Sequence, residues 1–175
     1  YQAVQAEDHQ VQWSIEGERT NLRYMDVTVT VGADSELVLR SSSGTVSRHE
    51  AKAADGPVTL QIQLTEGEML YELEIRDVYG NVYTYDKRLL VDHTAPLLEM
   101  IQPLPSHASV PEQRVSGFVE LGSTLEIDGK PVEVASDGYF LITGIRSAFT
   151  LTATDASGNV TSYHWEPKRS GGFTL

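Results

Sequence analysis

The sequence predicts an all-β protein built from two tandem antiparallel β-sandwich domains. Three observations in its 175 residues carry this prediction. Apolar and polar residues alternate along most segments, turn-forming residues separate those segments, and one turn motif occurs twice. No segment spaces its apolar residues at i, i+3, i+4 and i+7, so no core helix is expected.

Alternation with a period of two is typical of a strand with one buried face. Residues 58–64, VTLQIQL, place four apolar side chains on one face and Thr or Gln on the other. Residues 71–77, YELEIRD, alternate in the same way, as do residues 25–31 and 149–155. Turn signals lie between the strands at 31–34, 54–57, 66–67, 128–129 and 137–138. This pattern favours antiparallel sheets with one solvated face.

Two stretches of the first half do not follow the alternation. Ser41 to Ser43 are interpreted as a flexible loop. Residues 47–55, SRHEAKAAD, are long enough for one helical turn but too short and polar for a core helix.

The repeated motif defines the expected domains. It reads DVYGNV at residues 77–82 and DASGNV at residues 155–160, which are 155 − 77 = 78 positions apart. Residues 91–105 hold three prolines, and Pro96 forces Ala95 into an extended conformation, so we expect a stiff hinge there. The predicted organisation is a tail (1–9), a first domain (10–95), a second domain (96–167) and a C-terminal tail or linker (168–175).

Composition excludes several classes of function. Lys plus Arg number 13 against 25 for Asp plus Glu, giving a formal net charge of −12. Such a chain repels phosphate, so neither nucleic acid nor anionic lipid is an expected partner. No apolar run approaches the roughly 20 residues of a membrane span, so no direct membrane insertion is expected of this stretch. The absence of cysteine excludes disulfides, Cys-based metal sites and thiol nucleophiles.

The Asp-x-x-Gly-Asn motif has two interpretations. In the favoured one it is a hairpin turn, in which Asp77 or Asp155 accepts backbone N–H groups and Gly80 or Gly158 takes a positive φ. The alternative is a Ca²⁺ site, to which Asp92 at the joint would contribute. We therefore expect no cofactor, with Ca²⁺ as the alternative.

No pattern of catalytic residues is present. The five histidines have no spacing typical of a zinc site, and no serine lies in a G-x-S-x-G elbow. Exposed pairs such as Glu72 and Glu74 lie on one strand, whereas a glycosidase needs two opposed carboxylates in a cleft. The sequence predicts that the protein is not an enzyme.

Aromatic side chains are the best candidates for ligand contacts. Tyr79, Tyr83 and Tyr85 alternate on the last hairpin of the first domain, as do Tyr163 and Trp165 in the second. The favoured interpretation is that each set packs on the core. The alternative is an exposed platform on which sugar rings stack, and Tyr79 is expected to be exposed because it lies in the turn.

Residues 113–165 resemble bacterial immunoglobulin-like repeats, most closely the type first named for domain B of a glucodextranase. The resemblance rests on four short motifs in order: VSGFV (115–119), DGKPV (128–132), DGYF (137–140) and ATDASGN (153–159). The first domain resembles the same superfamily more weakly, through residues 64–82 and the VDHTAP exit at 91–96. Its first half departs from the pattern with a longer insertion at residues 40–56.

The resemblance implies an immunoglobulin-like sandwich for both domains. It also implies a non-catalytic, extracytoplasmic spacer or adhesive module of a bacterial cell-surface or secreted protein. Its partners would then be other domains of the same protein, a separate protein or a cell-wall glycan. Two alternatives stay open: an accessory, glycan-binding module of a secreted carbohydrate-active enzyme, and the ectodomain of a membrane-anchored sensor or regulator.

Overall fold

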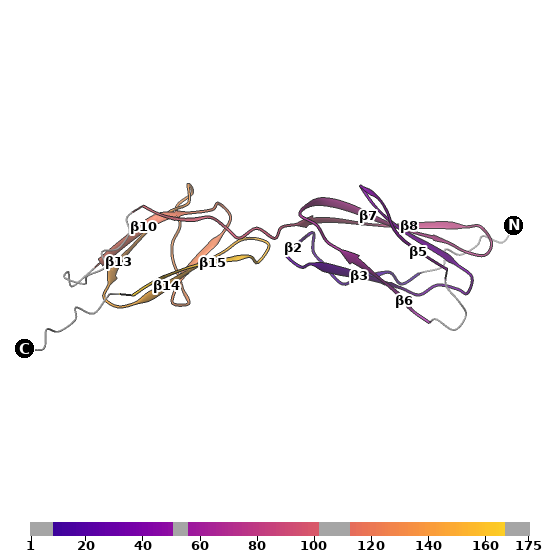
Figure 1. The fold of residues 1–175 in the computed structure, drawn as a ribbon, viewed down its shortest axis with the longest axis horizontal. Helices are drawn as coiled ribbons and strands as arrows, with labels where there is room; N and C mark the ends of the chain where they lie inside the picture. The colour runs from indigo at the N-terminus through magenta and orange to yellow at the C-terminus, as the bar shows by residue number, and fades with distance from the viewer. Residues whose placement is uncertain (1–8, 51–55, 102–112, 167–175) are drawn as a thin grey trace, which may run out of the picture. The chain divides into compact units, whose positions relative to one another are not determined.

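The computed structural model describes residues 9–50, 56–101 and 113–166. The chain divides into two compact units, Tyr1–His93 (unit 1) and Thr94–Leu175 (unit 2). The described residues contain strands and no helix, and each unit consists of two β-sheets (Figure 1). The predicted all-β fold of two tandem immunoglobulin-like sandwiches is confirmed.

The described residues of unit 1 form eight strands in a three-stranded and a five-stranded sheet. The smaller sheet has the order β1-β3-β6 and the larger the order β2-β8-β7-β4-β5. The strands are β1 (Gln12–Trp13), β2 (Arg19–Thr20), β3 (Tyr24–Val29), β4 (Glu36–Ser41), β5 (Gly44–Glu50), β6 (Val58–Gln63), β7 (Gly67–Arg76) and β8 (Val82–Val91).

The core of unit 1 lies between these sheets, where the alternation places it. Val58 and Ile62 of β6 are buried, whereas the Thr and Gln residues between them are exposed. Tyr71, Leu73 and Ile75 of β7 face inward and are at most 1% exposed. The predicted buried faces of both strands are therefore correct.

The insertion at residues 40–56 forms an added hairpin over most of its length. Ser41 belongs to β4 and pairs with Gly44, so the turn consists of Ser42 and Ser43. The Ser41 and Ser43 hydroxyl oxygens lie 2.8 Å apart, and Ser41 Oγ accepts the backbone N–H of Ser43. The loop interpretation is wrong for Ser41, which pairs with Gly44 in the hairpin, whereas Ser42 and Ser43 form the connecting turn. The helical turn proposed for 47–55 is also wrong for residues 47–50, which lie in β5; residues 51–55 lie outside the described part.

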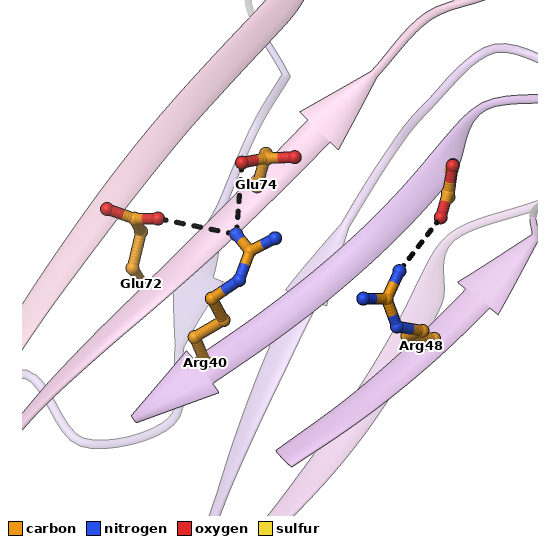
Figure 2. Close-up of polar contacts among 5 residues, drawn as sticks. Arg40, Arg48, Glu72 and Glu74 are labelled. Atoms are coloured by element: carbon orange, nitrogen blue, oxygen red, sulfur yellow. Dashed lines mark hydrogen bonds and ion pairs between the residues drawn. The ribbon is translucent and has the colours of Figure 1, made fainter. Parts of the chain in front are cut away.

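Charged side chains cover the outward face of the five-stranded sheet. Arg40 Nη1 lies 3.0 Å from Glu74 Oε2 and 3.6 Å from Glu72 Oε1 (Figure 2). Val38 shares its cross-strand row with Glu74 and Arg48 and is only 3% exposed, because the stems of these long side chains cover it. This face is therefore charged and solvated.

In the larger sheet, β2 runs parallel to its neighbour β8. Arg19 and Thr20 of β2 pair with Leu90 and Val91 of β8. The Leu90 N–H donates to the Glu18 carbonyl at 2.7 Å, and the Asp92 N–H donates to the Thr20 carbonyl at 2.9 Å. These bonds join the N-terminal part of unit 1 directly to its C-terminal strand.

In unit 2, the described residues form seven strands in two sheets, with the orders β13-β10-β9 and β12-β11-β14-β15. Its strands are β9 (Leu98–Met100), β10 (Gln113–Val119), β11 (Thr124–Ile127), β12 (Lys130–Pro131), β13 (Tyr139–Ile145), β14 (Phe149–Thr154) and β15 (Val160–Trp165).

The core of unit 2 includes Val115, Leu125, Phe140 and Leu151, all at most 2% exposed. Gly117 of β10 lies against β9 so closely that a Cβ atom there would overlap the Glu99 carbonyl oxygen. It would also lie 2.9 Å from Phe140 Cζ. Only glycine fits at this position, which explains the central residue of the VSGFV motif.

Candidate functional site

The first copy of the repeated motif joins β7 to β8 through an aspartate held by its own turn. Asp77 Oδ1 accepts the backbone N–H groups of Tyr79 (2.9 Å) and Asn81 (2.8 Å), and Oδ2 accepts the Asn81 side-chain amide (2.8 Å). Gly80 has a φ of 83°, a conformation that glycine adopts without strain. We call this arrangement the Asp77–Asn81 clasp.

The second copy joins β14 to β15 with the same bonds. Asp155 Oδ1 accepts the backbone N–H groups of Ser157 (2.8 Å) and Asn159 (2.9 Å), and Oδ2 accepts the Asn159 amide (2.9 Å). Gly158 has a φ of 89°. The predicted hairpin turn is confirmed in both units. The hydrogen bond from the asparagine side chain was not predicted from the sequence.

These hydrogen bonds determine the acidity of the two carboxyl groups. The bond from the Asn81 side chain, followed by those from the backbone of Asn81 and Tyr79, holds the pKa of Asp77 below its ordinary value. Burial alone would raise the pKa of Asp155, but the bonds from its own turn outweigh burial and lower it. Both groups are therefore bound in the turn as carboxylates.

The three residues of the proposed Ca²⁺ site do not belong to one turn. Asp77 and Asp155 belong to different units, and Asp92 follows β8, where its backbone N–H binds the Thr20 carbonyl. Ca²⁺ takes roughly six to eight oxygen ligands, whereas each turn supplies one carboxylate that already accepts three hydrogen bonds. Among the described residues, no group of three or more His, Cys, Asp or Glu is placed to hold a metal ion. The expectation of no cofactor stays a prediction, with Ca²⁺ as its alternative.

The three tyrosines of unit 1 do not form one exposed platform. Tyr79 lies in the turn and is 87% exposed. Tyr83 and Tyr85 are half-buried against the core, opposite Ile75 and Leu73 of β7.

Tyr83 and Tyr85 also hold the buried His9. The Tyr85 hydroxyl lies 3.2 Å from His9 Nδ1, and the Tyr83 ring packs edge-on against the imidazole at a centroid distance of 4.5 Å. The two tyrosines thus attach the N-terminal segment to β8, and of the three only Tyr79 presents an open ring.

The aromatic pair of unit 2 packs inside the sandwich. Trp165 is 7% exposed and stacks on Phe149 at a centroid distance of 5.8 Å. Tyr163 is half-buried and also contacts Phe149, at 6.3 Å. Sugar stacking by the five aromatic residues stays a prediction, and Tyr79 is the member whose exposure suits it.

The structure also brings together residues that were not among the predicted site residues. Residues 115, 117 and 119 of β10 face the core, so the residues between them face solvent. We call this outward surface of the β9–β10–β13 sheet the β10 face; it includes Arg114, Ser116, Phe118, Glu120, Tyr139 and Leu141. Phe118 is 40% and Leu141 50% exposed, and the Phe118 and Tyr139 rings pack edge to face at 5.7 Å. In the sequence, the position of Phe118 between the inward-facing Val115 and Val119 could have indicated this exposed surface.

Comparison with known proteins supports the fold. No protein-family model matches the sequence, and no curated protein matches it. One solved structure, of the fibronectin(III)-like modules of Clostridium thermocellum CbhA, has a TM-score of 0.51 at 12% identity, covering 88% of this chain and 90% of that one. A C-terminal 282-residue fragment of intimin, solved in complex with the intimin-binding domain of its translocated receptor, has a TM-score of 0.61 at 12% identity. That match covers 90% of this chain and 63% of the intimin chain.

These likenesses show the fold that bacterial immunoglobulin-like domains adopt. Within the described residues, no helix is long and apolar enough to cross a membrane.

Proposed function

We propose that this chain is a non-catalytic, extracytoplasmic spacer or interaction module of a bacterial cell-surface or secreted protein. Its partners are other domains of the same protein or a second protein. Two sandwich units, each with its own core and its own clasped closing hairpin, support this role. So does a fold shared with modules of CbhA and with a receptor-binding fragment of intimin.

The parallel pairing of β2 with β8 is the observation that carries the proposal. When the two ends of unit 1 are pulled apart, these strands are drawn along their length in opposite directions. Their hydrogen bonds are therefore loaded together in shear and not one after another. Lys87 reinforces the junction, because its Nζ donates to the carbonyls of Glu16 (3.1 Å) and Gly17 (2.7 Å).

Single-molecule pulling of the whole chain tests the load-bearing role. The Lys87→Met variant removes both bonds to the 16–17 segment, so we expect one of the two unfolding events to shift to lower force. The neighbouring Arg88→Met variant removes a charge from an exposed position of the same strand and is the matched control. Equal unfolding forces in Lys87→Met and wild type would contradict a load path through this junction.

Location requires a separate test in the producing bacterium. Protease added to intact cells, or fractionation of the medium, should reach the protein while a cytoplasmic marker stays protected. Protection equal to that of the marker would refute the extracytoplasmic role, whatever the outcome of the pulling experiment.

The exposed ring of Tyr79 favours a second candidate, a glycan-binding accessory module. Tyr79 projects from the β7–β8 turn, and the neighbouring Val78 is 57% exposed. Calorimetric titration with soluble cell-wall and plant oligosaccharides should then give a binding signal that Tyr79→Ala abolishes. The same substitution at Tyr24, an exposed tyrosine of β3 outside the candidate set, is a control for nonspecific effects. Absence of binding in the wild type would leave the spacer role as the sole proposal.

A further inference from the structure

We propose that the β10 face of unit 2 is a pairing surface through which two copies of this chain associate. The inference rests on the arrangement of side chains on this face and does not depend on where the protein works. Two other outward faces differ in character: that of the five-stranded sheet is charged around Arg40, although Leu70 and Val82 are exposed on it, and that of β14 carries Thr150, Thr152 and Thr154. The β10 face instead exposes aromatic and aliphatic side chains in its centre.

The side chains of this face lie in two central cross-strand rows. Phe118 lies between Tyr139 of β13 and the exposed Glu99 of β9, and Ser116 lies opposite Leu141. Arg114 lies toward one end of β10 and Glu120 just beyond the other, both exposed, six residues and therefore roughly 20 Å apart. Glu120 is held at its end of the face, because its Oε2 accepts the Leu97 N–H at 2.9 Å.

This pattern is complementary to itself. In a two-fold dimer whose axis runs across the strands at Gly117, β10 lies antiparallel over β10 of the second copy. Arg114 of each copy then meets Glu120 of the other, so each charge has an opposite partner. Phe118 lies over the small Ser116 of the second copy, and Tyr139 lies over its Leu141.

The charges also exclude the other simple two-fold arrangement. An axis parallel to β10 would place Arg114 over Arg114 and Glu120 over Glu120 of the second copy. Both contacts bring like charges together, which is unfavourable near a protein surface. The antiparallel arrangement is therefore the one that the sequence of β10 favours.

The size of the face determines the strength of the association. Three strands about 4.8 Å apart and about seven residues long offer a projected area of a few hundred Å² per copy. A stable dimer buries roughly 800 Å² per copy, so this contact belongs with weak, transient interfaces. We expect a dissociation constant on the order of 0.1–1 mM, also because two chains of formal charge −12 repel each other.

Sedimentation equilibrium of the full chain from about 0.02 to 2 mM tests the pairing across that expected range. The wild type should approach the dimer mass at the upper end. Arg114→Glu and Glu120→Arg should each remain monomeric, because each places like charges opposite one another in both halves of the dimer. Glu126→Arg is the matched control: it makes the same charge change at an exposed position of β11, on the other sheet.

Mixing the two single variants provides the decisive measurement. A heterodimer of Arg114→Glu with Glu120→Arg pairs an acid with a base at both ends, so the equimolar mixture should regain association. The double variant Arg114→Glu/Glu120→Arg should self-associate for the same reason. Thermal melting of each variant checks its folding, since Glu120→Arg also loses the bond to Leu97.

Three results would overturn the proposal. The wild type could stay monomeric at 2 mM, in which case the β10 face has another occupant or none. The single variants could associate as the wild type does, which would place the contact elsewhere. The mixture of folded single variants could stay monomeric, which would show that Arg114 and Glu120 do not meet between copies.

Discussion

Replacing Tyr71 with phenylalanine should stabilise unit 1. Tyr71 lies in the middle of β7, is 1% exposed, and its hydroxyl has no hydrogen-bond partner. A buried hydroxyl without a partner costs about 1–3 kcal/mol of folding free energy. Removing the oxygen atom leaves a void of roughly 15 Å³. This cavity reduces the expected stabilisation by about 0.4 kcal/mol.

The net effect on the free energy of unfolding is therefore an increase of about 0.6–2.6 kcal/mol. For a domain of this size, each kcal/mol raises the melting temperature by roughly 4–8 °C. Differential scanning calorimetry is the assay, and the transitions of the two units must be fitted separately because a two-domain chain is not a two-state system. The transition of unit 2 should not move, which provides an internal reference.

The pH dependence supplies a second readout. Burial raises the pKa of Tyr71 above its ordinary value, so the unfolded chain loses this proton before the folded one does. The contribution of Tyr71 to stability is therefore constant below about pH 10 and is lost as the pH rises further. The advantage of Tyr71→Phe over the wild type should consequently widen in the alkaline range.

Tyr85→Phe is the matched control, since it makes the same chemical change but is expected to have the opposite effect on stability. The Tyr85 hydroxyl bonds His9, so its removal should lower stability by about 0.5–1.5 kcal/mol. The reasoning is refuted if Tyr71→Phe destabilises unit 1, because the Tyr71 hydroxyl must then have a partner that the variant loses.

Three further predictions concern the glycine of β10, the two clasps and Ca²⁺. Gly117→Ala should lower the stability of unit 2 by about 3 kcal/mol, since the methyl group would overlap the Glu99 carbonyl. Gly17→Ala is the control: its methyl group would meet no atom closer than 4.0 Å, so both melting transitions should stay in place. The lowered pKa values of Asp77 and Asp155 give stability that is present above pH 3.8 and is lost as the pH falls through the folded-state values; acid titration followed by circular dichroism should be less steep when both are replaced by Asn. Millimolar Ca²⁺ added to chelator-treated protein should shift neither melting transition, and a rise in either would favour the ion site over the turn.

Period-two patterns predicted the buried faces correctly because the alternation within a single strand is enough to tell its buried face from its exposed face. The same logic applies to β8: Tyr83 and Tyr85 share the parity of buried Leu89 and Val91, which places their rings toward the core. Tyr79 has the same parity, but it precedes the strand, so its position in the turn and not its parity explains its exposure.

The short strands and the β4–β5 hairpin could not be predicted in this way. Arg19 and Thr20 form a strand only because β8 supplies hydrogen bonds from a segment some seventy residues away. Residues 44–50, GTVSRHE, have no apolar face, and their pairing with β4 determines their conformation. Similarly, the β10 face depends on which strand neighbours β10, because Tyr139 joins Phe118 only across the β10–β13 pair.

The clasps have a consequence for the order of folding. All their hydrogen bonds lie within five consecutive residues, so closing them costs little chain entropy compared with joining β2 to β8. We expect the β7–β8 and β14–β15 hairpins to form early, with φ-values near 1 around Asp77 and Asp155 and near 0 in β2.

Each of these hairpins lies at the C-terminal end of its unit. During synthesis, a unit therefore cannot nucleate until nearly all of its residues have emerged. Until its last strand appears, we therefore expect each unit to stay unfolded, the state in which a polypeptide can still be threaded through a narrow pore.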